Sequence, residues 1–231
     1  MSYPESSGAM ALAQPQNLFS RVFGIFTNPR ETMADIVTRP TWLVPLIILM
    51  LTSAVSVFFL QDLILENALD DMSKRPNVTQ EQMAAATPMI KIFTWIVPLF
   101  VPIINLIVAA LFLFIGNVIL GGESNFRTAF AVTCWSGLVT VVSSIVNVPL
   151  MLNRGEMRNA TSLNFMLPWE ENQSPLFFVL SQIDIFYLWW LVVLGLGFAA
   201  AYKLSTKKGI TTVFVAFAVY VAVVAGFKAI F

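Results

Sequence analysis

The chain has 231 residues, of which 58% are hydrophobic and only 11% are charged. Soluble domains carry about 45–50% apolar and about 25% charged residues, so a soluble fold could not bury this much apolar surface. Thirteen basic residues balance thirteen acidic ones, which argues against nucleic acid as a partner, because its phosphates require a basic face. Histidine is absent and Cys134 is the only cysteine. We therefore expect no disulfide, metal site or other cofactor.

The amino-terminal part predicts a tail followed by a short amphipathic helix. Residues 1–16 are small and polar and lack the basic region of a signal peptide, so we expect a disordered tail before one membrane domain at 17–231. Between Asn17 and Thr27, apolar residues recur at helical spacing, whereas Ser20 and Arg21 fall on other faces, where we expect them to be exposed to solvent. The apolar face consists of Phe19, Val22, Phe23 and Phe26.

A second short helix is predicted to start at Asn28. Asn28 is suited to the N-cap, Pro29 and Arg30 begin the helix, and Glu31 is placed to reach back to the cap. Two placements remain open for this helix pair. It lies in the membrane surface, or it packs beneath the bundle.

The first membrane span is predicted at 42–60, where no charged residue interrupts the apolar run. The following loop is acidic, turns near Pro76-Asn77, and contains a capping box between Thr79 and Gln82 that predicts a short helix. The adjacent Asp70 and Asp71 point to different sides of a helix, so a solvated loop is favoured over a cation site.

The next two spans, predicted at 92–120 and 128–152, form a hairpin around a short polar connector. Pro98 and Pro102 stand four residues apart and predict a kink, and Asn105 follows one turn later. Polar residues in the third span, Asn147 among them, suit contacts between helices.

The fourth and fifth spans are predicted at 175–201 and 210–230. Asp184 falls within the fourth span, and two interpretations are open. It is buried with a partner such as Asn147 or Lys228, which we favour, or it caps a span that begins at Ile185. Small residues four apart predict close packing of these two helices. They are Gly195, Gly197, Ala199, Ala201, Ala218, Ala222 and Gly226.

Basic residues predict the orientation. With five spans, seven of the thirteen Lys and Arg residues lie on the side of the amino terminus, mostly in short segments, and six lie in the longer, acid-rich loops opposite. Because short basic loops stay in the cytoplasm, we expect the amino terminus inside and the carboxyl terminus outside. The seven are Arg21, Arg30, Arg39, Arg127, Lys203, Lys207 and Lys208.

With these residues in view, the chain resembles the Yip family of five-span membrane proteins (the Yip-one domain), particularly its bacterial members, over about residues 18–230. The matching positions are Pro29, Arg30, Gly121, Gly122, Phe126, Arg127, Pro149, Asp184, Phe186, Trp189 and Gly195, together with the helix after Thr79. The resemblance implies an all-α membrane fold, a cytoplasmic amino terminus, a bacterial inner membrane, and recruitment of partners. The Asp-Leu-Tyr-Gly-Pro motif of the eukaryotic branch is absent, which argues against small-GTPase binding.

Two functions follow. The first is a non-enzymatic scaffold that binds the bilayer and other membrane proteins or copies of itself, because no catalytic motif is present. The alternative is a small transporter or channel in which Asn105, Asn147 and Asp184 converge with the two kink prolines.

Overall fold

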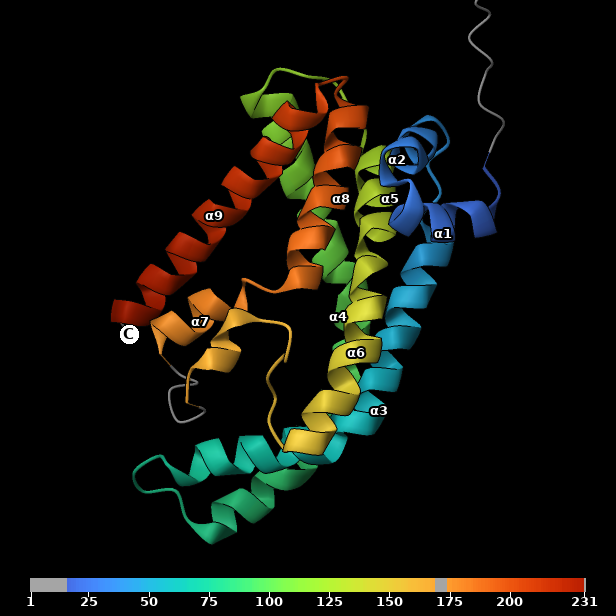
Figure 1. Cartoon of the computed structure of the whole chain (residues 1–231). Coiled ribbons are helices and arrows are strands. Elements are labelled where there is room, and N and C mark those ends of the chain that lie inside the picture. Colours follow the sequence, from blue (N-terminus) through green and yellow to red (C-terminus); the bar gives the residue numbers. More distant parts are fainter. Residues whose placement is uncertain (1–15, 169–173, 231) are drawn as a thin grey trace, which may run out of the picture.

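The computed structural model describes residues 16–168 and 174–230, and every regular element in these ranges is helical. The expected tail therefore lies outside the described residues, apart from Gln16. Two short helices, α1 (Leu18–Thr27) and α2 (Pro29–Thr38), lie at one end of a helical bundle, the upper end in Figure 1. The predicted start of α2 is confirmed at Pro29, but the side chain of Asn28 donates to Glu31 Oε2 at 2.6 Å instead of capping the helix.

The first long hairpin consists of α3 (Leu43–Ser73) and α4 (Gln80–Leu113), which pack along each other. The predicted capping box between Thr79 and Gln82 is present, but it opens α4 itself and not a separate helix. Helix α4 continues through Pro98 and Pro102 and passes into a π-helix, η1 (Phe114–Ile119). At the lower end of Figure 1, the last turns of α3 and the first turns of α4 turn aside from the bundle.

The core is centred on α5 (Phe126–Gly137), which α6 (Val139–Arg154) continues after Leu138. All ten residues from Thr128 to Gly137 are buried, because α1, α2, α3, α4 and α8 each contact this helix. Trp135 is the largest fully buried side chain. The predicted third span is thus the element around which the other helices assemble.

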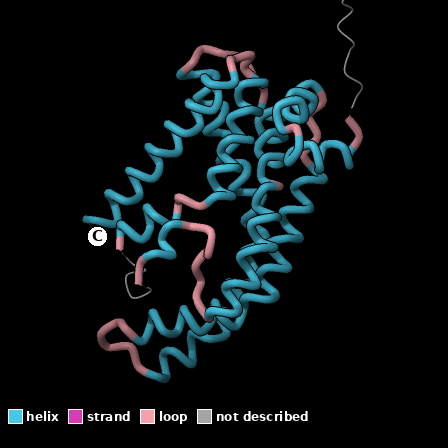
Figure 2. The backbone as a smooth tube through the Cα atoms, viewed as in Figure 1, coloured by secondary structure: helices cyan, strands magenta, loops and turns pink. Residues whose placement is uncertain are grey.

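The predicted fourth span is divided, which corrects the expectation of one helix over 175–201. After the 3-10 turn η2 (Leu163–Met166), α7 (Pro175–Ser181) ends before Asp184, and α8 (Ile185–Ala201) begins after it. Helix α9 (Thr206–Ile230) follows. Figure 2 shows the loop that separates α7 from α8.

Small residues bring helices α8 and α9 together near their connection, and the rings of Tyr187 and Phe217, 5.2 Å apart, extend the contact to the middle of α9. Gly195 and Ala199 of α8 contact Gly209, and an added Cβ at Gly209 would lie 2.5 Å from the Ala199 Cβ. Gly197 instead faces Val132 of α5, and nothing lies within 4 Å of a Cβ at Gly226. The predicted small-residue contact is therefore wrong for the second half of α9, which diverges from α8 and packs against α7 (Figure 1).

Within the described part of the chain, four helices are long and apolar enough to cross a membrane: Leu43–Ser73, Gln80–Ile119, Phe126–Arg154 and Thr206–Ala229. Helices α1 and α8 are apolar but shorter. Large apolar side chains on the outer faces of the long helices are exposed, such as Phe93 at 67% and Val223 at 63%. This outward apolar surface is what a bilayer, and not water, would stabilise.

Candidate functional site: the docked amino-terminal helices

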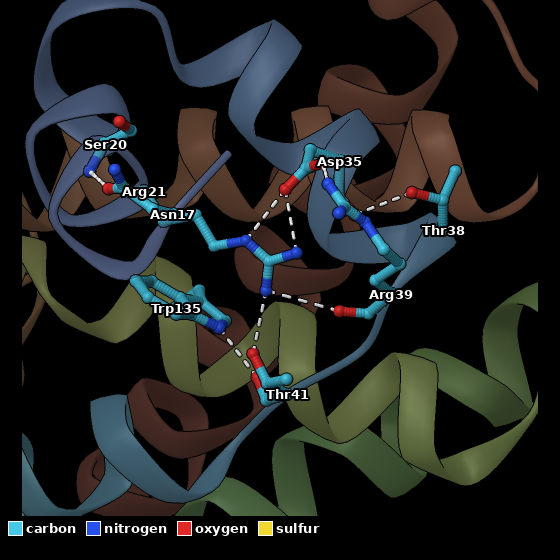
Figure 3. Close-up of polar contacts among 8 residues, drawn as sticks. All are labelled: Asn17, Ser20, Arg21, Asp35, Thr38, Arg39, Thr41 and Trp135. Atoms are coloured by element: carbon cyan, nitrogen blue, oxygen red, sulfur yellow. Dashed lines mark hydrogen bonds and ion pairs between the residues drawn. The ribbon is translucent and has the colours of Figure 1, made fainter. Parts of the chain in front are cut away.

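The most elaborate polar cluster joins α1 and α2 to the core (Figure 3). Arg21 of α1 is only 5% exposed, and its guanidinium contacts Asp35 of α2 through Nε and Nη2, both at 2.7 Å from Oδ2. Arg39 pairs with the other carboxylate oxygen of Asp35. The two arginines therefore share one carboxylate and tie α1 to α2.

The cluster continues from α1 into the centre of the bundle. Arg21 Nη1 donates to Thr41 Oγ1 at 2.8 Å and to the Arg39 carbonyl at 3.3 Å. Trp135 of α5 donates through Nε1 to the Thr41 carbonyl at 2.7 Å, and its ring lies 5.9 Å from the Arg21 guanidinium (Figure 3). A single chain of hydrogen bonds thus links the amino-terminal helices to the most buried helix.

The charges in the cluster set the ionisation of Asp35. Burial by itself would raise the pKa of this carboxyl, but hydrogen bonds from Arg39 and Arg21 and their positive charges outweigh it. The pKa of Asp35 consequently falls below its ordinary value of 3.8. The carboxylate stays charged down to acidic pH and keeps both arginines paired.

Helix α1 is oriented with its cation inward and two of its three phenylalanine rings outward. Arg21, Gly24 and Ile25 are buried, whereas Phe19 is 75% and Phe23 is 66% exposed. Two residues of the predicted apolar face, Phe19 and Phe23, are therefore exposed, whereas Val22 and Phe26 are partly buried against the core. The expectation that Arg21 lies in solvent is wrong, because Asp35 and Thr41 bind it inside. Exposed phenylalanines on a helix that is fixed to the bundle favour contact with lipid.

A second polar contact explains the Gly121-Gly122 motif. The ring of Tyr202, just after α8, packs where a Cβ would stand at Gly116 (1.9 Å) and at Gly122 (2.6 Å). Its hydroxyl donates to Asn117 Oδ1 at 2.7 Å. Gly121 also has a φ of +64°, a conformation that favours glycine. The motif thus lets the α4–α5 connection close over Tyr202.

The other residues that carry the family resemblance lie at separate places in the bundle. Arg127 donates to the Pro40 carbonyl at 3.1 Å, and the Phe126 ring stacks on Phe130 at 5.8 Å. Pro29 opens α2, and Arg30 beside it is exposed. Pro149 lies within α6, on an apolar groove between α3 and α6. Phe186 and Trp189 of α8 line a different apolar groove, next to α6.

Asp184 combines the two interpretations that the sequence left open, because it is both a helix cap and buried. It is 2% exposed, and its Oδ1 accepts from the backbone N–H groups of Phe186 and Tyr187 at 2.9 and 3.1 Å. Its Oδ2 accepts from the hydroxyl of Thr161, whose Oγ1 in turn accepts from Asn147 Nδ2 at 3.0 Å. The expected link to Asn147 exists, but it runs through a loop residue.

Asn105 and Lys228 do not join this group. The side chain of Asn105 donates to the Val101 carbonyl of its own helix at 2.9 Å. Lys228 is exposed, and its Nζ lies 5.8 Å from the ring of Phe178. Among the described residues, the four polar candidates therefore do not line one pathway, and no cluster of three or more potential metal ligands occurs.

Sequence reasoning missed the residues that make the main cluster. Asp35, Thr41 and Trp135 carry no motif, and only Arg21 gave a signal, as a lone cation among phenylalanines. Thr161 gave none, because it lies in a polar loop.

The helices define a polytopic, all-helical integral membrane protein. The model of the Yip1 domain matches residues 23–227, from the middle of α1 to the last turn of α9. The chain therefore belongs to the Yip1 domain family, as the resemblance indicated. No curated protein and no solved structure matches it.

Proposed function

We propose that this Yip1-family protein is a non-enzymatic scaffold that presents its amino-terminal helices to other membrane proteins, or to copies of itself, in membrane organisation. The observation that carries the proposal is the Arg21–Asp35–Thr41–Trp135 chain of contacts, which fixes α2 on the bundle. The outer side of α2 is left exposed, at Arg30, Glu31, Ala34 and Thr38. A rigid, polar surface at the membrane face is suited to recruiting partners.

We also propose five spans with the amino terminus in the cytoplasm of a bacterial cell and the carboxyl terminus outside. In Figure 1, α1, α2 and the α4–α5 and α8–α9 connections share the upper end. These short segments carry seven of the thirteen basic residues of the chain. Because lysine and arginine residues in short loops are retained in the cytoplasm, this distribution supports a cytoplasmic upper end. Helix α8 serves as the additional span, since its seventeen residues are close to the lower limit for crossing.

Site-specific photo-crosslinking tests the scaffold proposal. A photoreactive residue at Ala34 should give a discrete, saturable crosslinked product in native membranes, whereas one at the lipid-facing Val219 should give none. The Asp35→Ala variant should lower the yield at Ala34, because it releases α2. Absence of a product at Ala34, or a measurable ion or solute flux in proteoliposomes, would contradict the scaffold function.

Fusions to the carboxyl terminus test the orientation. Alkaline phosphatase after Phe231 should be active, and green fluorescent protein at the same point should be dark. The reverse pattern would overturn the topology while leaving the partner experiment valid.

A further inference from the structure

Helix α4 ends in a π-helix, the six residues of η1. The backbone N–H of Leu120 donates to the carbonyl of Ile115, five residues earlier, at 3.0 Å. A π-helix is rare, because α-helical hydrogen bonding is normally preferred, and it occurs mostly as a single turn within an α-helix, often at a functional site. A contact from outside the segment is therefore expected to keep the backbone in this form.

The ring of Tyr202 provides this contact. A Cβ at Gly116, within η1, would overlap the ring, and a Cβ at Gly122 would lie 2.6 Å from it. The Tyr202 hydroxyl donates to Asn117 Oδ1 at 2.7 Å and lies 3.5 Å from the Phe112 carbonyl. Rewinding η1 as an α-helix would turn the end of the segment by about one residue, or about 100°. The side chain of Asn117 would then leave Tyr202.

Asn117 also holds the connection that leads into the core helix α5. Its Nδ2 donates to the Ser124 carbonyl at 3.0 Å, and its Oδ1 accepts from the Ser124 backbone N–H at 3.1 Å. The next residue, Asn125, is the N-cap of α5. One amide side chain therefore joins Tyr202, the π-helix and the start of α5.

The turn that presents Tyr202 has an unfavourable backbone conformation. Tyr202 is the C-cap of α8, and Lys203 after it has a φ of +52°, at a position where helices usually place glycine. The N–H of Leu204 closes the turn by donating to the Ala199 carbonyl at 2.9 Å. A side chain is disfavoured in the left-handed conformation. The turn is therefore less stable than a glycine would make it, which suits a group that leaves its site.

We propose that Tyr202 is a releasable wedge that keeps η1 in the π form and so holds the α4–α5 connection on the bundle. When Tyr202 withdraws, η1 rewinds as an α-helix, Asn117 leaves Ser124, and the connection opens. The α8–α9 connection, which carries Tyr202, thereby controls the entry to α5 at the end of the bundle where both connections lie (Figure 1). This conformational switch does not depend on the scaffold function.

Amide hydrogen exchange of residues 120–125, in the full-length chain in micelles, measures the opening. Tyr202→Phe removes one hydrogen bond and should open roughly five- to tenfold more often. Tyr202→Ala removes the wedge and should open more often still, whereas the control Tyr220→Ala, exposed on α9, should exchange like the original protein. Lys203→Gly should slow the opening by relieving the turn, and Lys203→Gln, which removes only the charge, should not.

A deletion distinguishes a change of helical form from a simple loss of packing. Deleting Gly116 removes the extra residue of the π-helix and leaves an α-helix, which the Tyr202 ring obstructs. The deletion should therefore lower the melting temperature of the original chain at least twice as far as that of Tyr202→Ala, a non-additive result. Additive effects, failure of both deleted chains to fold, unchanged exchange in Tyr202→Ala, or equal exchange in the two Lys203 variants would overturn the proposal.

Discussion

Replacing Asp35 with alanine should release α1 and α2 from the bundle. The side chain of Arg21 is 6% exposed and that of Asp35 is 13% exposed, so the variant would leave a buried guanidinium without its counter-ion. Breaking a buried ion pair by removing one partner costs about 3–5 kcal/mol. Arg21 would keep its contact to Thr41 at 2.8 Å, and Arg39 is 43% exposed and can turn to solvent. We therefore expect the lower value, about 3 kcal/mol.

Amide hydrogen exchange in micelles measures this loss directly. A free energy of about 3 kcal/mol corresponds to a roughly hundredfold increase in local opening, which should appear as faster exchange in α1 and α2 but not in α5. The control is Asp70→Asn, which breaks the exposed pair between Asp70 and Lys74. Exposed pairs contribute about 0–1 kcal/mol, so α1 and α2 should exchange normally in that variant.

A double variant separates the charge effect from simple loss of packing. Arg21→Met combined with Asp35→Leu removes both charges and replaces them with apolar groups, which is often neutral for a buried pair. Its exchange should return toward that of the original protein. If Asp35→Ala exchanged normally, or if the double variant exchanged as fast as Asp35→Ala, the ion pair would not be what holds these helices.

Three further changes test other contacts. Gly116→Ala should destabilise the protein by about 1–3 kcal/mol, because its Cβ would overlap the Tyr202 ring. The control Gly226→Ala, whose Cβ meets nothing, should be neutral or stabilising in thermal melts. Equal melting temperatures of the two variants would refute the ring contact. Asp184→Asn should keep the helix cap and lower the stability of the protein only modestly. Asp184→Leu should lower it by about 2–3 kcal/mol, because it removes the cap and leaves buried polar groups unpaired. Similar melting temperatures of the two variants would argue against capping. Because folding lowers the pKa of Asp35, its stabilisation is present above that group's ordinary value of 3.8 and is lost as pH falls through the folded pKa. Local opening of α1, measured as exchange relative to the intrinsic rate of each amide at the same pH, should therefore rise below about pH 4. Asp35→Asn should not show this rise.

Local sequence patterns predicted the helices well, for physical reasons that can be named. The start of α2 at Pro29 and the capping box at Thr79 depend on residues within one turn, and both are in the structure. The long apolar runs predicted α3 and α4, because an uncharged segment of that length must be helical in a membrane. Such information is contained within each segment.

Contacts between distant segments could not be predicted in the same way. Its charge and its position in the helical periodicity predict that Arg21 is exposed. Asp35, fourteen residues later, nevertheless binds it inside the protein. Asp184 stands in an apolar run. Only the fold shows that the hydroxyl of Thr161, from a distant loop, donates to its carboxylate and that the helix is interrupted at this residue. In both cases a partner far along the chain decides the burial of a charge.

The short length of α8 has a consequence for the surrounding lipid. Seventeen residues rise about 26 Å as a helix, whereas the hydrocarbon core of a bilayer is about 30 Å thick. The neighbouring α9, with twenty-five residues, is about 37 Å long. In the proposed five-span arrangement, α8 therefore matches a thinner bilayer than the neighbouring α9 does. This hydrophobic mismatch should draw the leaflet inward beside Asp184, and such one-sided thinning would favour regions where the membrane is already thin or curved.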